Sequence, residues 1–138
     1  MPAVLVDAGP MAALLNTNDE WHDWTRQTIQ RLPTPALTTE PALTEAMFLL
    51  TRDGFDADDL FALAEAGVIK VGIEFNRERA AFRSLMRKYR DVPMSLADAT
   101  LVRLSELHRD CRLLTFDTHF EIYRRHRNKT IPLVIPAQ

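Results

Sequence analysis

The 138-residue sequence contains one cysteine, Cys111, and only four glycines. A single cysteine excludes a disulfide within the chain and a zinc site built from several cysteines, and it is typical of the reducing cytoplasm. The scarcity of glycine excludes the glycine-rich loops of Walker and dinucleotide-binding motifs. The longest apolar run is five residues, at 46–50, whereas a membrane-spanning helix needs about 20. No basic segment followed by a long apolar one opens the chain, so we expect a cytoplasmic protein with no secretory signal and no membrane partner.

The charge of the sequence is nearly balanced, with 17 basic and 19 acidic residues and a formal net charge of −2. That sum gives little reason to expect a nucleic-acid partner. However, residues 1–66 carry a net charge of −8 and residues 67–138 a net charge of +6. Such asymmetry points to a polyanionic partner, unless folding mixes the two halves and averages their charges. Both interpretations stay open from composition alone.

The pattern of apolar residues predicts one α/β domain spanning residues 1–138. Short apolar runs predict strands at 4–6, 36–38, 68–71, 112–115 and 133–135. Helical spacing, prolines and capping residues predict helices at 10–16, 18–32, 41–52, 57–66, 75–90 and 95–108, and a short one beginning at Asp117. Strands that alternate with helices indicate a three-layer α/β/α fold around a mostly parallel sheet of about five strands.

Four acidic residues lie where the ligand site of such a fold is expected. Asp7 and Asp117 follow predicted strands, and Glu45 and Asp98 lie early in predicted helices. Ligands bind beyond the carboxyl ends of parallel strands, where the strand order reverses. Taken singly, each acid has a structural explanation as a helix cap or as a favourable charge near a helix N-terminus. Asp98, three residues after Ser95, fits a capping box.

Taken together, the four acids predict a cation site. Carboxylates that share a site repel one another, so either a pKa rises or a cation is needed. Oxygen ligands alone suit hard cations such as Mg²⁺ or Mn²⁺ rather than zinc. Such ions stabilise the oxygens that exchange in phosphoryl transfer.

Four short segments carry a family resemblance. They read Val-Asp-Ala-Gly-Pro-Met at 6–11, Leu-Thr-Glu-Ala at 43–46, Ser-Leu-Ala-Asp-Ala-Thr-Leu-Val at 95–102 and Leu-Leu-Thr-Phe-Asp-Thr-His-Phe at 113–120. In this order and at this chain length, they resemble the PIN-domain nucleases, and among those the VapC toxins of VapBC toxin–antitoxin systems. Many members have Ser or Asn two residues after the first Asp, where this chain has Gly9.

The resemblance implies a function and a set of site residues. It implies a Mg²⁺- or Mn²⁺-dependent endoribonuclease that hydrolyses RNA phosphodiester bonds, forms a homodimer and is inhibited by a cognate antitoxin protein. Asp7, Glu45, Asp98 and Asp117 match the family's catalytic and metal-binding acids, and Thr115 matches a hydroxyl residue that supports the active site.

Two basic clusters are candidate RNA contacts. The first lies on the predicted helix at 75–90 and includes Arg83 and Arg87, and the second, at 124–129, includes Arg125. Arginines beside an acidic cleft offset its repulsion of phosphates. A solvated surface of either segment is an equally good explanation, and neither cluster indicates recognition of particular bases.

Three other functions are compatible with parts of the sequence. A phosphatase of the haloacid-dehalogenase type needs Asp-x-Asp after the first strand, but Asp7 is followed by Ala8 and Gly9. A phospho-accepting receiver domain needs a late lysine and an aspartate on a central strand, and only Lys129 is available. A PIN-like module that binds RNA or protein with weak or no catalysis is the third alternative, ranked below the nuclease because all four acids are present.

Overall fold

The computed structural model describes residues 2–137. Its strands are β1 (Ala3–Val6), β2 (Ala36–Thr38), β3 (Ile69–Val71), β4 (Cys111–Leu114), β5 (Arg124–Arg125), β6 (Lys129–Thr130) and β7 (Leu133–Val134). Its helices are α1 (Ala8–Leu15), α2 (His22–Gln30), α3 (Glu40–Arg52), α4 (Asp58–Glu65), α5 (Phe75–Lys88), α6 (Leu96–Leu107) and a short 3₁₀ helix, η1 (Thr118–Glu121).

The central sheet has five strands in the order β3-β2-β1-β4-β7, and every neighbouring pair is parallel. The predicted α/β class and five-stranded sheet are therefore confirmed. β5 and β6 form a separate antiparallel hairpin. The inner strands of a parallel sheet are hydrogen-bonded on both sides and covered on both faces, which is why most residues of β1 and β4 are apolar and buried.

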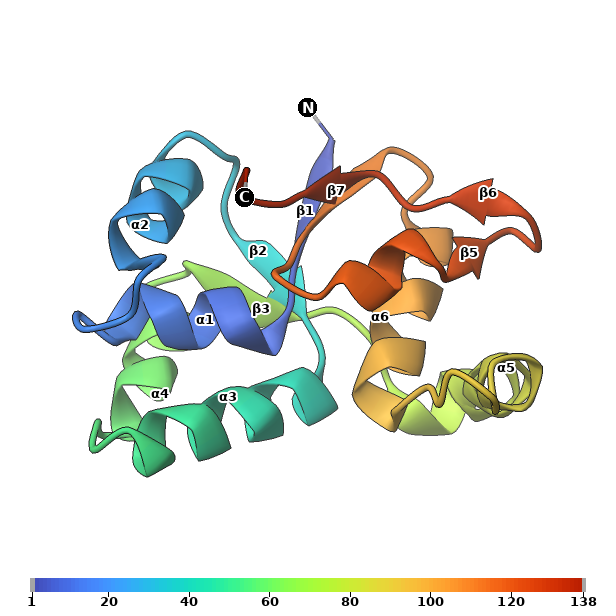
Figure 1. The fold of residues 1–138 in the computed structure, drawn as a ribbon, viewed down its shortest axis with the longest axis horizontal. Helices are drawn as coiled ribbons and strands as arrows, with labels where there is room; N and C mark the ends of the chain where they lie inside the picture. Colours follow the sequence, from blue (N-terminus) through green and yellow to red (C-terminus); the bar gives the residue numbers. More distant parts are fainter. Residues whose placement is uncertain (1, 138) are drawn as a thin grey trace.

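The strand order reverses beside β1. From β1 the chain builds β2 and β3 on one side and then returns to add β4 and β7 on the other. Because crossover connections are right-handed, this reversal sends the later helices to the opposite face. Figure 1 shows α1 to α4 on one side of the strands and α5 and α6 on the other. The three predicted layers are thus present, and the switch point lies between β1 and β4.

Side chains at the helix starts explain where three of the helices begin. The side chain of Asp7 accepts a hydrogen bond from the backbone of α1, and that of Thr39 accepts one from the backbone of α3. Ser95 and Asp98 form the predicted capping box of α6, each accepting from the other's backbone N–H. All three helices therefore start at the carboxyl end of the sheet or next to it.

An aromatic cluster fixes α2 against the switch point. The Phe116 ring lies 6.3 Å from Trp21 and 6.1 Å from Trp24 between ring centroids. The same ring also explains Gly9, because a Cβ atom built there would lie 3.0 Å from Phe116 Cδ2. A side chain at position 9 would therefore displace the ring, and the departure from Ser or Asn is accommodated by packing.

The structure differs from the sequence-based expectations in two local places. The second helix begins at His22 rather than 18, because Asp19 closes a turn by accepting a 2.8 Å hydrogen bond from the Trp21 N–H. The β5–β6 hairpin was not predicted, since its residues are mostly basic and lack the apolar alternation that marks a strand. Over residues 2–137, no helix combines the length and the apolar character needed to cross a bilayer.

Candidate active site

Asp7 and Asp117 follow adjacent parallel strands at the switch point. Val6 is paired with Leu114, so β1 and β4 end level with each other. The Asp7 N–H donates to the Leu114 carbonyl at 3.0 Å, so the backbone hydrogen bonds between the two strands continue as far as Asp7 itself. The structure therefore places these two acids at the edge where the sequence predicted them.

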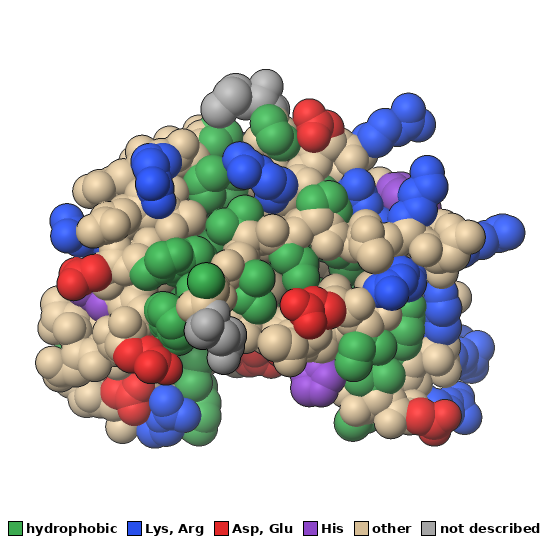
Figure 2. All heavy atoms as spheres, turned by 45° about the horizontal axis from the view of Figure 1, so that its top comes forward, with side chains coloured by type: hydrophobic (Ala, Val, Ile, Leu, Met, Phe, Trp, Pro, Cys, Tyr) green, Lys and Arg blue, Asp and Glu red, His purple; other side chains and the backbone are tan. Residues whose placement is uncertain are grey.

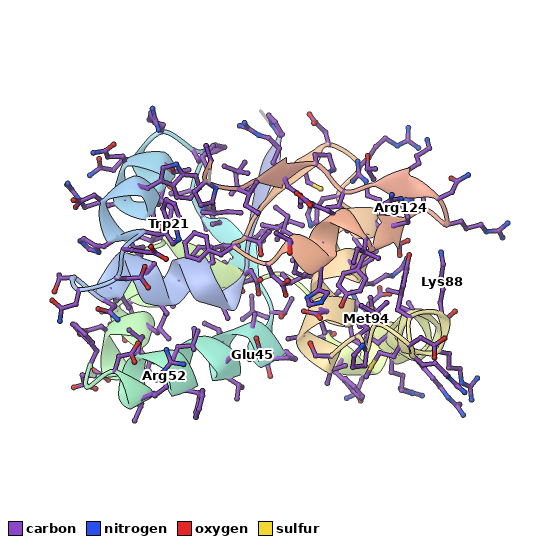
Figure 3. All side chains as sticks on the ribbon, viewed as in Figure 1. Trp21, Glu45, Arg52, Lys88, Met94 and Arg124 are labelled. Carbon is purple, nitrogen blue, oxygen red and sulfur yellow. The ribbon has the colours of Figure 1, made fainter. Side chains whose placement is uncertain are left out.

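Glu45 and Asp98 reach the same edge from α3 and α6. The two helices are joined by a buried hydrogen bond of 2.9 Å from the Thr100 hydroxyl to the Thr39 hydroxyl. Figure 3 shows Glu45 in the first half of α3, toward the end of that helix nearest the middle of the molecule. The four predicted acids thus come from four separate elements and gather at one end of the sheet.

The buried hydroxyl of Thr115 links the acids of the two strands. It donates to Asp7 Oδ2 at 2.8 Å and accepts from the Asp117 N–H at 3.0 Å. The other oxygen of Asp7 accepts from the Ala8 N–H at 2.7 Å. Both oxygens of Asp7 are therefore held in fixed directions. Thr115, which was predicted to support the site, makes one of these contacts.

Asp7 is buried and has a strongly raised pKa. Its side chain is 8% exposed. Burial raises the pKa of Asp7 to about 6, although the hydrogen bonds from Thr115 and Ala8 act in the opposite direction. The charges of Asp98 and Glu45 raise this pKa further. Asp7 is thus a buried acid with acidic neighbours.

The pKa of Glu45 is raised as well. Partial burial of its carboxylate raises the pKa of Glu45, and the charges of Asp98 and Asp117 add to the rise. Asp7 is therefore affected by the charges of Asp98 and Glu45, and Glu45 by those of Asp98 and Asp117. Among residues 2–137, none of the four forms an ion pair with a lysine or an arginine.

Helix capping accounts for part of this arrangement. Asp7 caps α1, Asp98 caps α6, and Asp117 caps η1 by accepting from the His119 N–H at 2.9 Å. The capping contacts that the sequence suggested for these residues are therefore present. They do not explain why Asp7 is buried, since a capping side chain works equally well at the surface.

The donor set fits a hard divalent cation in its chemistry. It consists of carboxylates whose charges are not balanced by neighbouring arginine or lysine, and Asp7 is a buried charge that lacks a cationic partner. In the described part of the chain, no three acidic, histidine or cysteine side chains are already arranged to hold one ion. The Asp117 carboxylate instead faces the His119 ring, with Oδ1 at 2.8 Å from Nδ1.

The site has a contact that sequence reasoning missed. The phenol of Tyr123, which is fully buried, donates a 2.9 Å hydrogen bond to Asp98 Oδ2. Burial and this hydrogen bond raise the pKa of Tyr123, so the phenol stays protonated. Tyr123 lies 25 residues from Asp98, and no spacing rule connects the two positions.

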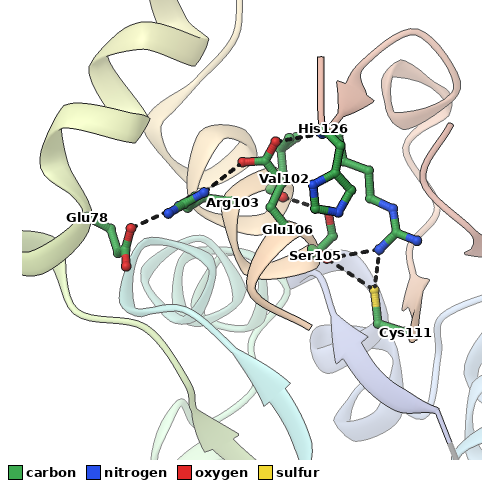
Figure 4. A network of polar contacts seen from close by, with 8 residues as sticks. Glu78, Val102, Arg103, Ser105, Glu106, Cys111 and His126 are labelled. Carbon is green, nitrogen blue, oxygen red and sulfur yellow. Dashed lines mark hydrogen bonds and ion pairs between the residues drawn. The ribbon is translucent and has the colours of Figure 1, made fainter. Parts of the chain in front are cut away.

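Arg125 was predicted as an RNA contact, and in the structure its guanidinium group makes hydrogen bonds within the fold. One guanidinium nitrogen lies 2.9 Å from the Ser105 carbonyl and 3.3 Å from Cys111 Sγ, and the other lies 3.1 Å from the Arg109 carbonyl. The side chain therefore ties the hairpin to the end of α6 and the start of β4. Figure 4 shows these contacts beside a second chain of contacts, in which the backbone N–H of His126 donates to Glu106, and Glu106 and Glu78 both pair with Arg103.

Arg83 and Arg87 lie as predicted on an exposed face of α5. They line a cavity of about 400 Å³ whose other lining residues include Phe75 and Leu96. These two apolar residues also line a neighbouring cavity of about 530 Å³ that contains Glu45. The two cavities share these lining residues, so a surface depression connects the arginines with Glu45. In Figure 2 most basic side chains gather at the end of the molecule formed by α5 and the hairpin.

Comparison with known solved structures finds similar folds. A chain of VapC20 from Mycobacterium tuberculosis, described as a toxin that cleaves the sarcin–ricin loop, superposes with a TM-score of 0.69. It is 24% identical, and the match covers 83% of this chain and 90% of that one. A toxin–antitoxin complex from Klebsiella pneumoniae gives a TM-score of 0.62 at 17% identity, covering 84% and 87%.

Comparison with sequences adds the family. No curated protein sequence matches the chain. The family model of the PIN domain matches residues 4–125, a span that contains all four acids of the site. On this match and the shared fold, the chain belongs to the PIN domain family.

Proposed function

We propose that this protein is a Mg²⁺- or Mn²⁺-dependent endoribonuclease and the toxin of a toxin–antitoxin pair. The buried carboxylate of Asp7, with Asp98 and Glu45 as like-charged neighbours, carries the proposal. The rise of its pKa from 3.8 to about 6 costs about 3 kcal/mol of folding free energy at neutral pH. A helix cap functions without this loss of stability. A buried carboxylate that awaits a cation accounts for it, because function is commonly gained at the expense of stability.

The chain's own residues would prepare hydrolysis of a phosphodiester bond. Asp7, Glu45, Asp98 and Asp117 would hold the ion, which when bound offsets the charge on the phosphate oxygens and makes water a better nucleophile. Thr115 and the Ala8 N–H keep the carboxylate of Asp7 in one orientation. Glu45 is an exposed residue of α3, so its oxygens would be accessible to the attacking water.

The substrate path would follow the arginines of α5 toward the acids. Phosphates at Arg83 and Arg87 would place the next part of the strand over Phe75 and Leu96 and bring it to Glu45. Positive charge beside an acidic centre offsets its repulsion of the RNA backbone. The guanidinium groups at Arg83 and Arg87 form no ion pair in the described chain, so both are available to phosphates.

Arg83→Glu and Arg87→Glu are each expected to raise the KM for RNA roughly fivefold at low salt and to leave kcat nearly unchanged. Each change removes one phosphate contact, so the slope of log KM against log salt falls by about 0.7. Steady-state cleavage over a range of salt concentrations measures both quantities. Arg31→Glu is the matched control, because Arg31 is an exposed arginine at the end of α2. Equal effects in the control would contradict the proposed path.

The proposed partners follow from the relatives. The fold is shared with a toxin in one solved structure and with a toxin–antitoxin complex in another, which supports a cognate antitoxin protein as partner. Phe48 on α3 and Phe61 on α4 are 66% and 58% exposed, and exposed aromatics are typical of protein interfaces. Homodimer formation and a cytoplasmic location stay predictions.

One observation favours an alternative. The carboxylates in residues 2–137 do not form a ready-made three-ligand cation site, as expected of a PIN-like module that binds RNA or protein with weak or no catalysis. The two functions differ in their need for a metal ion. A noncatalytic module would bind RNA in EDTA and leave it intact when Mg²⁺ or Mn²⁺ is supplied.

The proposal is tested by incubating the purified protein with a panel of structured RNAs. We expect cleavage with Mg²⁺ or Mn²⁺ that stops on addition of EDTA, because oxygen-ligated ions of this kind supply the electrostatic stabilisation. Denaturing gels with mapped product ends would show internal cuts. Asp98→Asn is the inactive control. Cleavage that EDTA leaves unchanged, or intact RNA with both ions, would refute the proposed activity.

A further inference from the structure

The phenol of Tyr123 stands out because it is a neutral donor aimed at one oxygen of a site carboxylate. Asp98 Oδ2 accepts from the Tyr123 hydroxyl at 2.9 Å and from the Ser95 N–H at 3.4 Å. Within residues 2–137, Asp98 Oδ1 accepts no hydrogen bond. The phenol therefore makes the shorter of the two contacts that orient this carboxylate.

The position of the phenol is fixed by packing. The Tyr123 side chain is fully buried, and its ring meets Tyr89 edge-on at 5.1 Å and Phe120 edge-on at 5.4 Å between centroids. The His119 ring stacks on it at 6.4 Å with 23° between the planes. A ring held on these sides cannot turn without disturbing the core, so its hydroxyl is a fixed point for Asp98.

Asp98 needs such a fixed point. The terminal torsion of an aspartate is broad, so the carboxylate rotates readily when it is not held. Asp7 and Glu45 both interact with its negative charge, and like charges push one another apart. An arginine in place of the phenol would also orient Asp98, but it would cancel the charge that a cation needs. A protonated phenol orients the carboxylate and leaves the charge in place.

We infer that Tyr123 is a positioning residue that holds Asp98 Oδ2 and thereby directs Oδ1 toward the cation site. The inference rests on the proposed function, because it assigns Tyr123 to the cation site of that same nuclease. Hydrogen bonds from neighbouring residues to ligating side chains typically change metal affinity by about 10- to 100-fold. Removal of one phenolic oxygen should therefore weaken metal binding while the aromatic core stays filled.

Titration of the metal-free protein with Mn²⁺ in a calorimeter tests this without any activity assay. Tyr123→Phe is expected to raise the dissociation constant for Mn²⁺ by about 10- to 100-fold. Tyr89→Phe is the matched control, since its ring lies in the same cluster and its hydroxyl accepts from the Arg124 N–H at 2.8 Å rather than touching Asp98. The control should bind Mn²⁺ within about twofold of the wild type.

A double-mutant cycle then shows whether Tyr123 acts through Asp98. Asp98→Ala alone should weaken Mn²⁺ binding, and addition of Tyr123→Phe should weaken it no further, because the acceptor of the phenol's hydrogen bond is already gone. Additive losses, an unchanged Tyr123→Phe variant, or equal losses in Tyr89→Phe would each overturn the inference. Wild-type protein that binds no Mn²⁺ would overturn the proposed cation site as well, so the two failures are distinguishable.

Discussion

Asp7→Asn is expected to lower the rate of RNA cleavage at saturating Mg²⁺ by at least about 100-fold, the size typical of losing a preorganised electrostatic group. Asparagine has nearly the shape of aspartate, and its carbonyl oxygen can still accept from the Ala8 N–H, so α1 keeps its cap. The substitution removes the negative charge and one oxygen ligand from the centre of the site. Single-turnover cleavage, with circular dichroism to verify folding, measures the loss.

Asp23→Asn is the matched control for this prediction. Asp23 is an aspartate of α2 whose side chain is 81% exposed, so the same chemical change occurs outside the site. It should leave the rate unchanged. Asp7→Asn protein that folds and keeps more than about a tenth of the wild-type rate would contradict a catalytic role for Asp7.

The stability of the metal-free protein is expected to fall by about 2 kcal/mol between about pH 4 and pH 6 because of Asp7, and by about 3 kcal/mol in all once the pH exceeds about 7. Burial raises the pKa of Asp7 from 3.8 to about 6. Between these two pH values the folded protein still holds a proton that the unfolded chain has released. Raising the pH in this window therefore favours the unfolded chain. The pKa of Glu45, which is also raised, adds a change of the same sign.

Urea denaturation in EDTA from pH 4 to pH 7.5 measures this loss. Other groups titrate in the same range, so the quantity to compare is the stability difference between wild type and Asp7→Asn at each pH. That difference should move in favour of Asn as the pH rises, and Mg²⁺ should reverse the trend in the wild type, since the ion binds the ionised carboxylate. A difference that stays constant across the range would show that Asp7 is not the buried acid described.

The architecture was readable from local features of the sequence. The apolar runs before Asp7 and Asp117 are strands of the central sheet, and Ser95 with Asp98 forms the capping box expected of their spacing. Caps and helical periodicity depend on residues within a few positions of one another, which is why they could be predicted. The start of α2 at His22 and the β5–β6 hairpin were not predicted, because turn geometry and tertiary contacts decide the structure at both places.

The roles of the arginines could be predicted only in part. Arg83 and Arg125 both belong to basic clusters and look alike in the sequence. Arg83 lies exposed in a depression next to the site, whereas Arg125 binds backbone carbonyls at the end of α6. The difference depends on which carbonyl groups the fold leaves without partners, and composition does not contain that information.

The sequence by itself determined the strand–helix alternation, the parallel sheet and the four acids that follow its strands or begin its helices. Only the tertiary structure decided how these acids behave. The Thr115–Asp7 hydrogen bond joins residues 108 positions apart, and the Tyr123–Asp98 bond depends on an aromatic cluster built from separate elements. The pKa of Asp7 depends on burial and on neighbouring charge, and both exist only once distant segments have packed together.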